Sequence, residues 1–138
     1  MKQISVFLEN KPGSLHAVLT KLKEWNINLR ALSLADTADF GVLRFIVEKP
    51  EQLVEQLRKE NFTATLTEIL VVGVDDRPGG LSQIVEVLTL NSISIEYLYA
   101  FVSPEGQKAY VVMRVEDVQR ASNILREAQA FLLDDINI

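Results

Sequence analysis

The stretches "ENKPGSLHAV" at residues 9–18 and "DDRPGGLSQI" at residues 75–84 are two versions of one phrase. Each has an acidic residue, then Asn or Asp, a basic residue, Pro-Gly, one variable residue and Leu. The two prolines, Pro12 and Pro78, are 66 positions apart. Repetition at a fixed spacing indicates an internal duplication, so the phrase predicts two copies of one structural unit.

The residues that follow each phrase keep the same spacing and are typical of a helix. Apolar side chains recur at i, i+3, i+4 and i+7, which is the stripe of an amphipathic helix. The stripe is Leu15, Val18, Leu19 and Leu22 in the first copy, and Leu81, Ile84, Val85 and Leu88 in the second. Farther along the chain the spacing grows to 68, which places two extra residues in the turn "SPEGQ" at 103–107.

The pattern of the remaining segments predicts the same order of elements in both copies. An alternating strand (3–8; 69–74) leads through the Pro-Gly turn into the helix, and a second strand begins near Ile27 or Ile93. A third strand (42–47; 109–115), a second helix (50–59; 118–129) and a last strand (63–68; 131–135) follow, with Pro50 at a first helical position. The order βαββαβ predicts an α+β fold of two tandem ferredoxin-like domains, at 1–67 and 68–138, with antiparallel sheets and helices on one face.

Composition narrows the classes of partner. The chain has 138 residues, 48% of them hydrophobic and 24% charged, with a net charge of −5 and no Cys. This acidic balance disfavours nucleic acid and anionic membranes as partners. No apolar run approaches the roughly 20 residues that span a bilayer, and the first residues alternate like a strand instead of resembling a secretory signal. We therefore expect a cytoplasmic protein without disulfides.

The Pro-Gly turn has two interpretations. Asn10 and Asp76 lie three residues before Gly13 and Gly79, where a side-chain oxygen can cap the nascent helix. Capping explains Asn, Asp and Pro but not Gly, which is unfavourable inside a helix by about 0.5–1 kcal/mol relative to Ala. A bare backbone at a helix N-terminus leaves free N–H groups that hold an anion. Alternatively, the Gly lets the helix pack close to the next strand.

The residues around the turn favour a zwitterion over a phosphate. Phosphate cradles usually have several glycines and a positioned Lys, whereas here the acidic pairs 9–10 and 75–76 would repel a phosphate. A free α-amino acid fits both charges: its carboxylate binds N–H groups near Gly13, Ser14, Gly79 or Gly80. Its ammonium binds the amide oxygen of Asn10 or the carboxylate of Asp76. Lys11 and Arg77 either assist or are ordinary exposed basic residues.

The pattern Asn/Asp-x-Pro-Gly-x-Leu after a strand, within βαββαβ, resembles the ACT domain, the amino-acid-sensing module of metabolic enzymes. The resemblance covers nearly the whole chain, twice, and the first copy is similar to the serine-binding regulatory domain of bacterial phosphoglycerate dehydrogenase. It implies that Asn10 and Asn28 hold the effector, with Asp76 and Ser94 at these places in the second copy. The expected ligand-binding residues are Asn10, Lys11, Pro12, Gly13, Ser14, Leu15, Asn28, Asp76, Arg77, Pro78, Gly79, Gly80, Leu81 and Ser94. A stand-alone tandem pair also resembles small bacterial proteins regarded as amino-acid-binding.

Ligands of ACT domains usually lie where two domains sit side by side, so the resemblance implies Pro-Gly loops that face a shared interface. Val87 and Leu90 lie outside the apolar stripe of their helix, which indicates a covered helix face. In "SIEYLYAF" (94–101), Ile95, Tyr97, Tyr99 and Phe101 alternate along one strand face. Such a row is most often core, but on the face opposite the helices it would be a dimer surface. We expect a homodimer.

Features of an enzyme are scarce. His16 is the single His and is expected to be solvated, and no Cys is present for nucleophilic or metal chemistry. The pairs 75–76 and 134–135 lack a metal-binding spacing. Phe7 and Phe45 could stack on RNA as exposed aromatics, but the acidic charge and the missing RNA-binding motif argue against it. We expect neither catalysis nor a cofactor.

Two hypotheses from different classes follow. The first is a non-catalytic sensor that binds a free amino acid at the Pro-Gly loops, changes how domains or a partner enzyme are engaged, and so regulates amino-acid metabolism. The second is a constitutive interaction subunit of a metabolic enzyme, in which the loops only cap helices and the apolar faces bind the enzyme.

Overall fold

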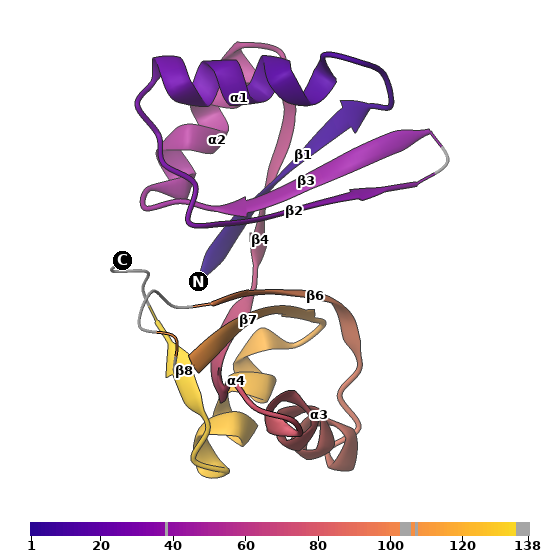
Figure 1. The fold of residues 1–138 in the computed structure, drawn as a ribbon, viewed down its shortest axis with the longest axis vertical. Coiled ribbons are helices and arrows are strands. Elements are labelled where there is room, and N and C mark those ends of the chain that lie inside the picture. The colour runs from indigo at the N-terminus through magenta and orange to yellow at the C-terminus, as the bar shows by residue number, and fades with distance from the viewer. Residues whose placement is uncertain (38, 103–105, 107, 135–138) are drawn as a thin grey trace. The chain divides into compact units, whose positions relative to one another are not determined.

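Each copy of the repeat folds into a four-stranded antiparallel sheet with two helices on one face (Figure 1). The computed structural model describes residues 1–37, 39–102, 106 and 108–134. Of the turn predicted at 103–107 only Gly106 is described, and Asp135, the end of the predicted last strand, is also outside the described residues. The chain divides into two compact units, the first covering Lys2–Thr67 and the second beginning at Glu68, and each is described by itself.

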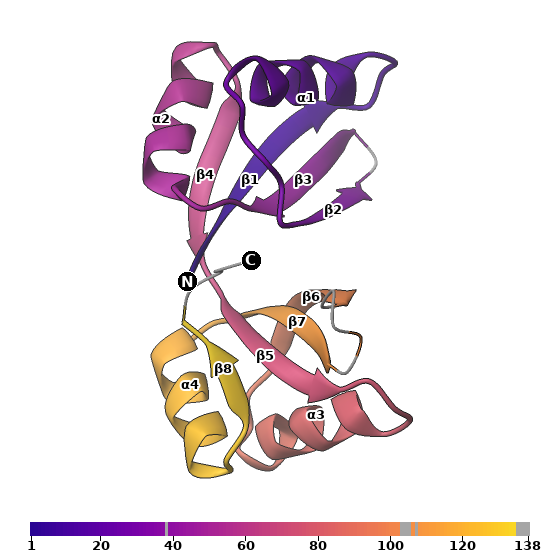
Figure 2. The ribbon, with the colours of Figure 1, turned by 60° about the vertical axis from the view of Figure 1, so that its left-hand side comes forward.

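The first copy has the element order βαββαβ. Its elements are β1 (Lys2–Glu9), α1 (Ser14–Glu24), β2 (Ala31–Asp36), β3 (Phe40–Ile46), α2 (Pro50–Lys59) and β4 (Thr63–Glu68). The sheet order is β2-β3-β1-β4, so β3 lies between the two strands that α1 connects. This is the split βαβ arrangement, and α1 and α2 cover the same face of the sheet (Figure 2).

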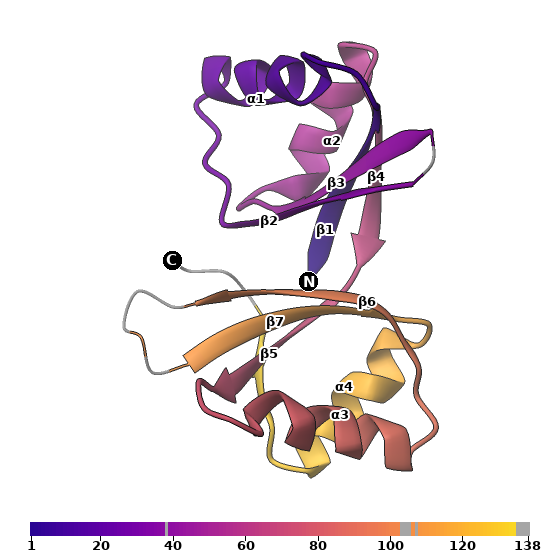
Figure 3. The same cartoon turned by 45° about the vertical axis from the view of Figure 1, so that its right-hand side comes forward.

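The second copy repeats this order. Its elements are β5 (Leu70–Asp75), α3 (Gly80–Leu90), β6 (Ile95–Val102), β7 (Lys108–Val115), α4 (Val118–Glu127) and β8 (Phe131–Leu133). The sheet order is β6-β7-β5-β8, and α3 and α4 cover one face (Figure 3). The prediction of two tandem ferredoxin-like domains is confirmed.

The core of each unit lies between the sheet and its helices. In β1 the alternating Ile4, Val6 and Leu8 point toward the helices, where they meet Val18 of α1 and Leu57 of α2. The second core uses the same scheme. Its fully buried members include Val72, Leu88, Met113, Val115 and Leu125. Alternation on strands and the i, i+3, i+4 stripe on helices therefore account for both cores.

Phe45 belongs to the first core and is 0% exposed. Its ring faces the helices together with Leu43 and Val47 of the same strand region. A side chain in this position cannot stack on a nucleic-acid base. The suggestion that Phe45 is an exposed aromatic is therefore wrong, whereas Phe7, on the other face of the sheet, is exposed.

The four helices in the described part of the chain end in the same left-handed cap. The residues just past the helices have positive φ, at 55° for Asn26, 66° for Asn61, 57° for Ser92 and 63° for Gln129. In α1, the N–H of Asn26 donates to Lys23 O at 3.0 Å and that of Ile27 to Leu22 O at 2.8 Å. This is the Schellman pattern, and the other three helices repeat it.

These caps change the predicted start of the second strand. Ile27 and Ile93, predicted near the beginning of β2 and β6, instead close the helix caps and pack on the cores. The strands begin later, at Ala31 and Ile95. An apolar residue after a helix serves a Schellman cap as well as a strand, so the apolar pattern alone did not separate them.

Glycine at the strained caps is expected to stabilise the second unit. Left-handed backbone is unfavourable for a residue with a Cβ by about 1–2 kcal/mol, and glycine adopts it freely. Glycine also raises the conformational entropy of the unfolded chain, which opposes this gain. Ser92→Gly and Gln129→Gly are therefore each expected to raise the free energy of unfolding by about 0.5–1 kcal/mol. Urea unfolding followed by circular dichroism measures it. A loss in both variants would contradict the assigned cap geometry.

The aromatic row of β6 lies on the face opposite the helices, except for its first member. A bulge between Ile95 and Tyr97 reverses the alternation, so Ile95 packs on the helix-side core. The rings of Phe101 and Tyr110 on the opposite face have centroids 5.4 Å apart. The prediction that all four side chains share one face is thus wrong for Ile95, because one extra residue shifts the register.

The two apolar residues outside the predicted stripe of α3 behave differently. Val87 packs against the core of its own unit, together with Ile84 and Leu88, so it needs no external cover. Leu90, at the end of α3, is 77% exposed. Leu81 is exposed as well, which shows that α3 is rotated about its axis relative to the predicted stripe. The inference of a covered helix face therefore rests on Leu90 alone.

Candidate functional site

The two Pro-Gly loops have the same backbone shape. Gly13 and Gly79 occupy the N-cap positions of α1 and α3 with φ of 91° and 87°, a left-handed conformation. A Cβ added at either glycine would meet no atom within 4 Å, so space is not what selects glycine there. The conformation requires glycine, and the alternative of close helix packing is wrong at these two positions.

Close packing does hold at Gly80. A Cβ on this residue would overlap the backbone carbonyl oxygen of Asp75, the last residue of β5. The first copy has Ser14 at the matching place, with room for its side chain. The start of α3 therefore lies tight against its strand, and one of the two glycines in "PGG" serves the turn and the other the packing.

Neither Asn10 nor Asp76 caps its helix. The helix N-termini of α1 and α3 have no side-chain capping hydrogen bond. The amide Nδ2 of Asn10 instead donates to the backbone oxygen of Thr37 at 3.4 Å, in the turn between β2 and β3. The capping interpretation is therefore wrong, and the amide oxygen of Asn10 remains an acceptor at the surface.

The backbone donors differ from those first expected. The N–H of Ser14 donates to Lys11 O at 3.4 Å and that of Gly80 to Arg77 O at 3.1 Å, so both are already engaged within the turn. In α1 the first helical bond runs from Ala17 N to Gly13 O. The N–H groups of Leu15 and His16 thus belong to the first turn, which has no acceptor inside the helix. Leu81 and Ser82 hold the same places in α3.

The basic residue of each loop pairs with the acidic residue at the end of the preceding strand. Lys11 Nζ lies 3.0 Å from Glu9 Oε2, and Arg77 Nε lies 3.4 Å from Asp75 Oδ2, all on exposed side chains. Exposed pairs of this kind add little stability. In the first loop this pair neutralises Glu9, so an approaching carboxylate meets the positive end of the helix dipole. The second loop carries in addition the carboxylate of Asp76, which repels an anion.

Asn28 does not meet Asn10 within its own unit. Asn10 precedes α1 and Asn28 follows it, and the eleven-residue helix separates them by about 15 Å at 1.5 Å per residue. Asn28 instead lines a separate hollow of about 430 Å³ with Leu19 and Lys23. In the second copy Asp76 and Ser94, both exposed, are likewise at opposite ends of α3.

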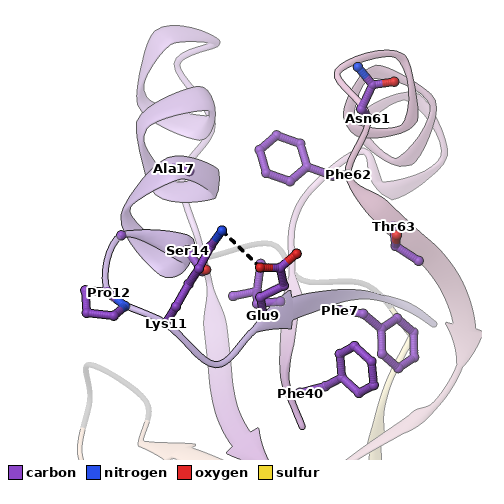
Figure 4. A pocket seen from close by; sticks show the side chains of 12 residues that line it. Phe7, Glu9, Lys11, Pro12, Ser14, Ala17, Phe40, Asn61, Phe62 and Thr63 are labelled. Atoms are coloured by element: carbon purple, nitrogen blue, oxygen red, sulfur yellow. Dashed lines mark ion pairs between the residues drawn. The ribbon is translucent and has the colours of Figure 1, made fainter.

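A larger cavity of about 950 Å³ opens beside the first loop (Figure 4). Loop residues Lys11, Pro12, Gly13 and Ser14 form one side. The opposite side comes from Asn61 and Phe62 in the turn between α2 and β4, and from Thr63 at the start of β4. Phe7 and Phe40 complete the wall from the two central strands. The cavity thus brings four of the expected site residues together with a wall that the sequence did not indicate.

The second copy has a cavity at the same place, but a smaller one of about 260 Å³. It is lined by Gly80 of the loop region, by Lys108 of β7, by Gln129 and Ala130 of the turn before β8, and by Phe131, the first residue of β8. The register confirms the match, because Glu9 faces Phe40 in the first sheet and Asp75 faces Lys108 in the second. The repeat therefore carries two equivalent cavities with different walls.

Sequence reasoning missed the phenylalanine wall. Its residues come from three separate segments of the chain, so no local sequence motif predicts that they lie together. A signal was nevertheless present: Phe7 falls between Val6 and Leu8, where the alternation of β1 calls for a polar side chain. Phe40 is a similar apolar residue at a strand end, and both are exposed in the structure.

The described residues do not form a metal centre. His16 is exposed in the first turn of α1. Within the described ranges no three His, Cys, Asp or Glu side chains are grouped so that they could hold a metal ion. Among the helices of these same ranges, none has the length and apolar character that crossing a membrane requires.

Comparisons with known proteins agree with the fold. The family model described as "ACT domain pair" matches residues 1–138. Protein BT0572 from Bacteroides thetaiotaomicron has 36% identity, with 96% of this chain and 90% of that chain covered and a TM-score of 0.89. No curated protein sequence matches.

More distant structures share the fold alone. The ligand-free regulatory subunit of aspartate kinase from Thermus thermophilus has 18% identity, covers 92% of this chain and 91% of that one, and has a TM-score of 0.66. Aspartate kinase from Synechocystis has 19% identity and a TM-score of 0.63, with 93% of this chain but 24% of that chain covered. ACT domain pairs are regulatory domains, and the match spans every residue of the sequence. The chain belongs to the ACT domain pair family.

Proposed function

We propose that this chain is a non-catalytic sensor that binds a free α-amino acid at its Pro-Gly loop and regulates amino-acid metabolism. The observation that carries the proposal is the cavity of the first copy, which opens beside Gly13 and Ser14 at the start of α1. A pocket of this size next to a helix N-terminus combines a place for a side chain with donors for a carboxylate. Membership of a regulatory family supports this assignment.

The ligand would be held through its two charged groups. Its carboxylate accepts hydrogen bonds from the first-turn N–H groups of Leu15 and His16. Its ammonium donates to the amide oxygen of Asn10, whose Nδ2 is turned toward Thr37 O. Opposite charges are thus met by opposite ends of one loop, as a zwitterion requires.

Asn28 would complete the site from a second copy of the chain in a homodimer. Its distance from Asn10 along α1 excludes a joint contact with one ligand inside one unit. A ligand that touches both copies binds one arrangement of the dimer more tightly and shifts the population toward it. That shift is the signal passed to a partner enzyme.

Thermal unfolding in the presence of each of the twenty amino acids tests the proposal. A ligand at 100 times its dissociation constant is expected to add about 2.7 kcal/mol to the unfolding free energy of the unit that binds it. Asn10→Ala is expected to remove this gain with little loss of fold, because the side chain is exposed and makes one long hydrogen bond. The matched variant Asp76→Ala changes the same place in the second copy.

A gain that survives in Asp76→Ala but not in Asn10→Ala assigns the ligand to the first loop. If both variants lose the gain, the ligand binds at both loops. If only Asp76→Ala loses it, the ligand binds at the second loop. A panel in which no amino acid raises the midpoint contradicts the proposal. Valine at Gly13 is a poor probe, because a β-branched residue at φ of 91° is strained before any ligand binds.

A constitutive interaction subunit is the second candidate function, and one observation favours it. Leu32 and Leu34 on β2 are exposed on the face that carries the helices, at the free edge of their sheet. Leu98 and Val102 repeat this on β6. Exposed apolar side chains along a sheet edge are typical of a docking surface. A flat amino-acid panel together with stable association with a larger enzyme would support this candidate instead.

A further inference from the structure

The cavity of the first copy has an unusually apolar wall for a site beside a charged loop. Phe7 is 44% exposed and Phe40 is 51% exposed, although both rings are large and apolar. They lie on adjacent strands, with Phe7 opposite Val42 and Phe40 opposite Glu9, so they are diagonal neighbours on the sheet. Two such rings at a cavity wall leave apolar surface that a bound side chain can cover.

A third ring, that of Phe62, stands on the opposite side of the cavity. Phe62 follows the left-handed Asn61 at the end of α2, and its N–H donates to Leu57 O at 3.0 Å. The ring packs in part on the core of its unit. Figure 4 shows it between Asn61 and the α1 helix at Ala17, across the cavity from Phe7 and Phe40.

The charged groups of the lining are confined to the loop side, whereas Asn61 and Thr63 add neutral polar groups on the opposite side. The two charged residues on the cavity lining are Glu9 and Lys11, and they pair with each other at 3.0 Å. A charged ligand side chain in the apolar part would lose its hydration without gaining a partner. An apolar side chain there would instead be removed from water against the rings.

The second copy supplies an internal comparison. Gly73, Lys108 and Ala130 stand where the first copy has Phe7, Phe40 and Phe62. The ring of Phe131 lies over Gly73, where a Cβ would come within 2.8 Å of it. Lys108 Nζ lies 5.0 Å from the centre of the same ring.

The unit's own aromatic ring and a cation thus occupy this part of the second cavity. Its volume of about 260 Å³ is below the range of about 300–1,000 Å³ typical of small-molecule sites, whereas the first cavity is within that range. The duplication has left one large apolar cavity and one smaller cavity.

We infer that the first copy selects amino acids with a large apolar side chain, such as phenylalanine or leucine, through Phe7, Phe40 and Phe62, and that the second cavity takes no ligand. The inference rests on the proposed function, since the loop must hold the charged groups of the amino acid. The inference adds to the proposed function which class of amino-acid side chain is recognised and which copy of the repeat binds it.

Titration calorimetry of the full chain with phenylalanine, leucine, serine and lysine tests the inference. Wild type is expected to bind phenylalanine and leucine about tenfold or more tightly than serine and lysine. Phe40→Lys places the residue of the second copy at an exposed position of the wall. It is expected to weaken phenylalanine binding at least about tenfold.

Phe131→Thr is the matched control, because Phe131 is also 51% exposed and the change gives the second cavity the residue of the first. It is expected to leave phenylalanine affinity unchanged. Tighter binding of serine or lysine, lost in Asn10→Ala, would overturn the inferred selectivity and leave the sensor standing. Loss in Phe131→Thr but not in Phe40→Lys would overturn the choice of copy. Binding of no amino acid would remove the proposed function itself.

Discussion

Alanine at Gly80 is expected to destabilise the second domain by about 3 kcal/mol. The added Cβ would overlap the carbonyl oxygen of Asp75, and this oxygen belongs to the backbone at the end of β5, where it cannot rotate away. Alanine is otherwise favourable in a helix by about 1 kcal/mol relative to glycine. A net loss of stability therefore requires that the overlap with Asp75 costs more than the helix gains from alanine. Such a loss would show that α3 lies close against the end of β5.

Gly79→Ala and Gly13→Ala serve as controls for Gly80→Ala. Both glycines have positive φ and open space around the missing Cβ, so alanine is expected to cost only about 1–2 kcal/mol at each. Urea unfolding followed by circular dichroism gives the free energies. Trp25, the single tryptophan, packs on the core of the first domain and reports that domain separately by fluorescence. Equal losses at Gly79 and Gly80 would contradict the steric argument.

The fold was predictable because its signals are local and repeated. Helix stripes, strand alternation and Pro50 at the first position of α2 each depend on residues close in sequence, and two copies confirm each other. The bulge after Ile95 was not predictable, since an extra residue in a strand leaves the composition unchanged. The same is true of the left-handed caps, which use Asn, Ser and Gln in place of glycine.

The site was only half predictable for a different reason. The Pro-Gly loop is a contiguous motif, and its place at the start of α1 follows from the sequence. The wall depends on strand register, which brings Phe7 and Phe40 together from segments 33 positions apart. The partner of Asn10 was also hidden, because Thr37 lies in a turn whose position depends on the whole sheet. Tertiary pairing therefore decided what local patterns could not.

Replacing Phe45 with alanine is expected to lower the unfolding free energy of the first domain by about 3–5 kcal/mol. The ring is 0% exposed and lies on the helix face of β3, opposite Ile4 of β1 and Leu32 of β2. Its removal leaves a cavity at the centre of the sheet that rigid strands cannot close. Trp25 fluorescence during urea unfolding measures the loss, and Phe45→Leu, which conserves much of the volume, is expected to cost less than about 1.5 kcal/mol.

Met113 provides the matched position in the second domain, 68 residues later and also fully buried. Met113→Ala is expected to lower the unfolding free energy of the second domain by about 2–5 kcal/mol. It should leave the urea midpoint reported by Trp25 fluorescence unchanged. A Trp25 transition that moves as far in Met113→Ala as in Phe45→Ala would show that the two domains unfold as one unit.

This pair of variants also gives a sharper test of ligand binding. A bound amino acid should offset part of the first-domain loss in Phe45→Ala, by about 2.7 kcal/mol at 100 times the dissociation constant. Phe45 packs on the helix side of the sheet and does not line the cavity, so its replacement leaves the residues of the binding site in place. The same ligand should not offset the second-domain loss in Met113→Ala if the second cavity takes no ligand.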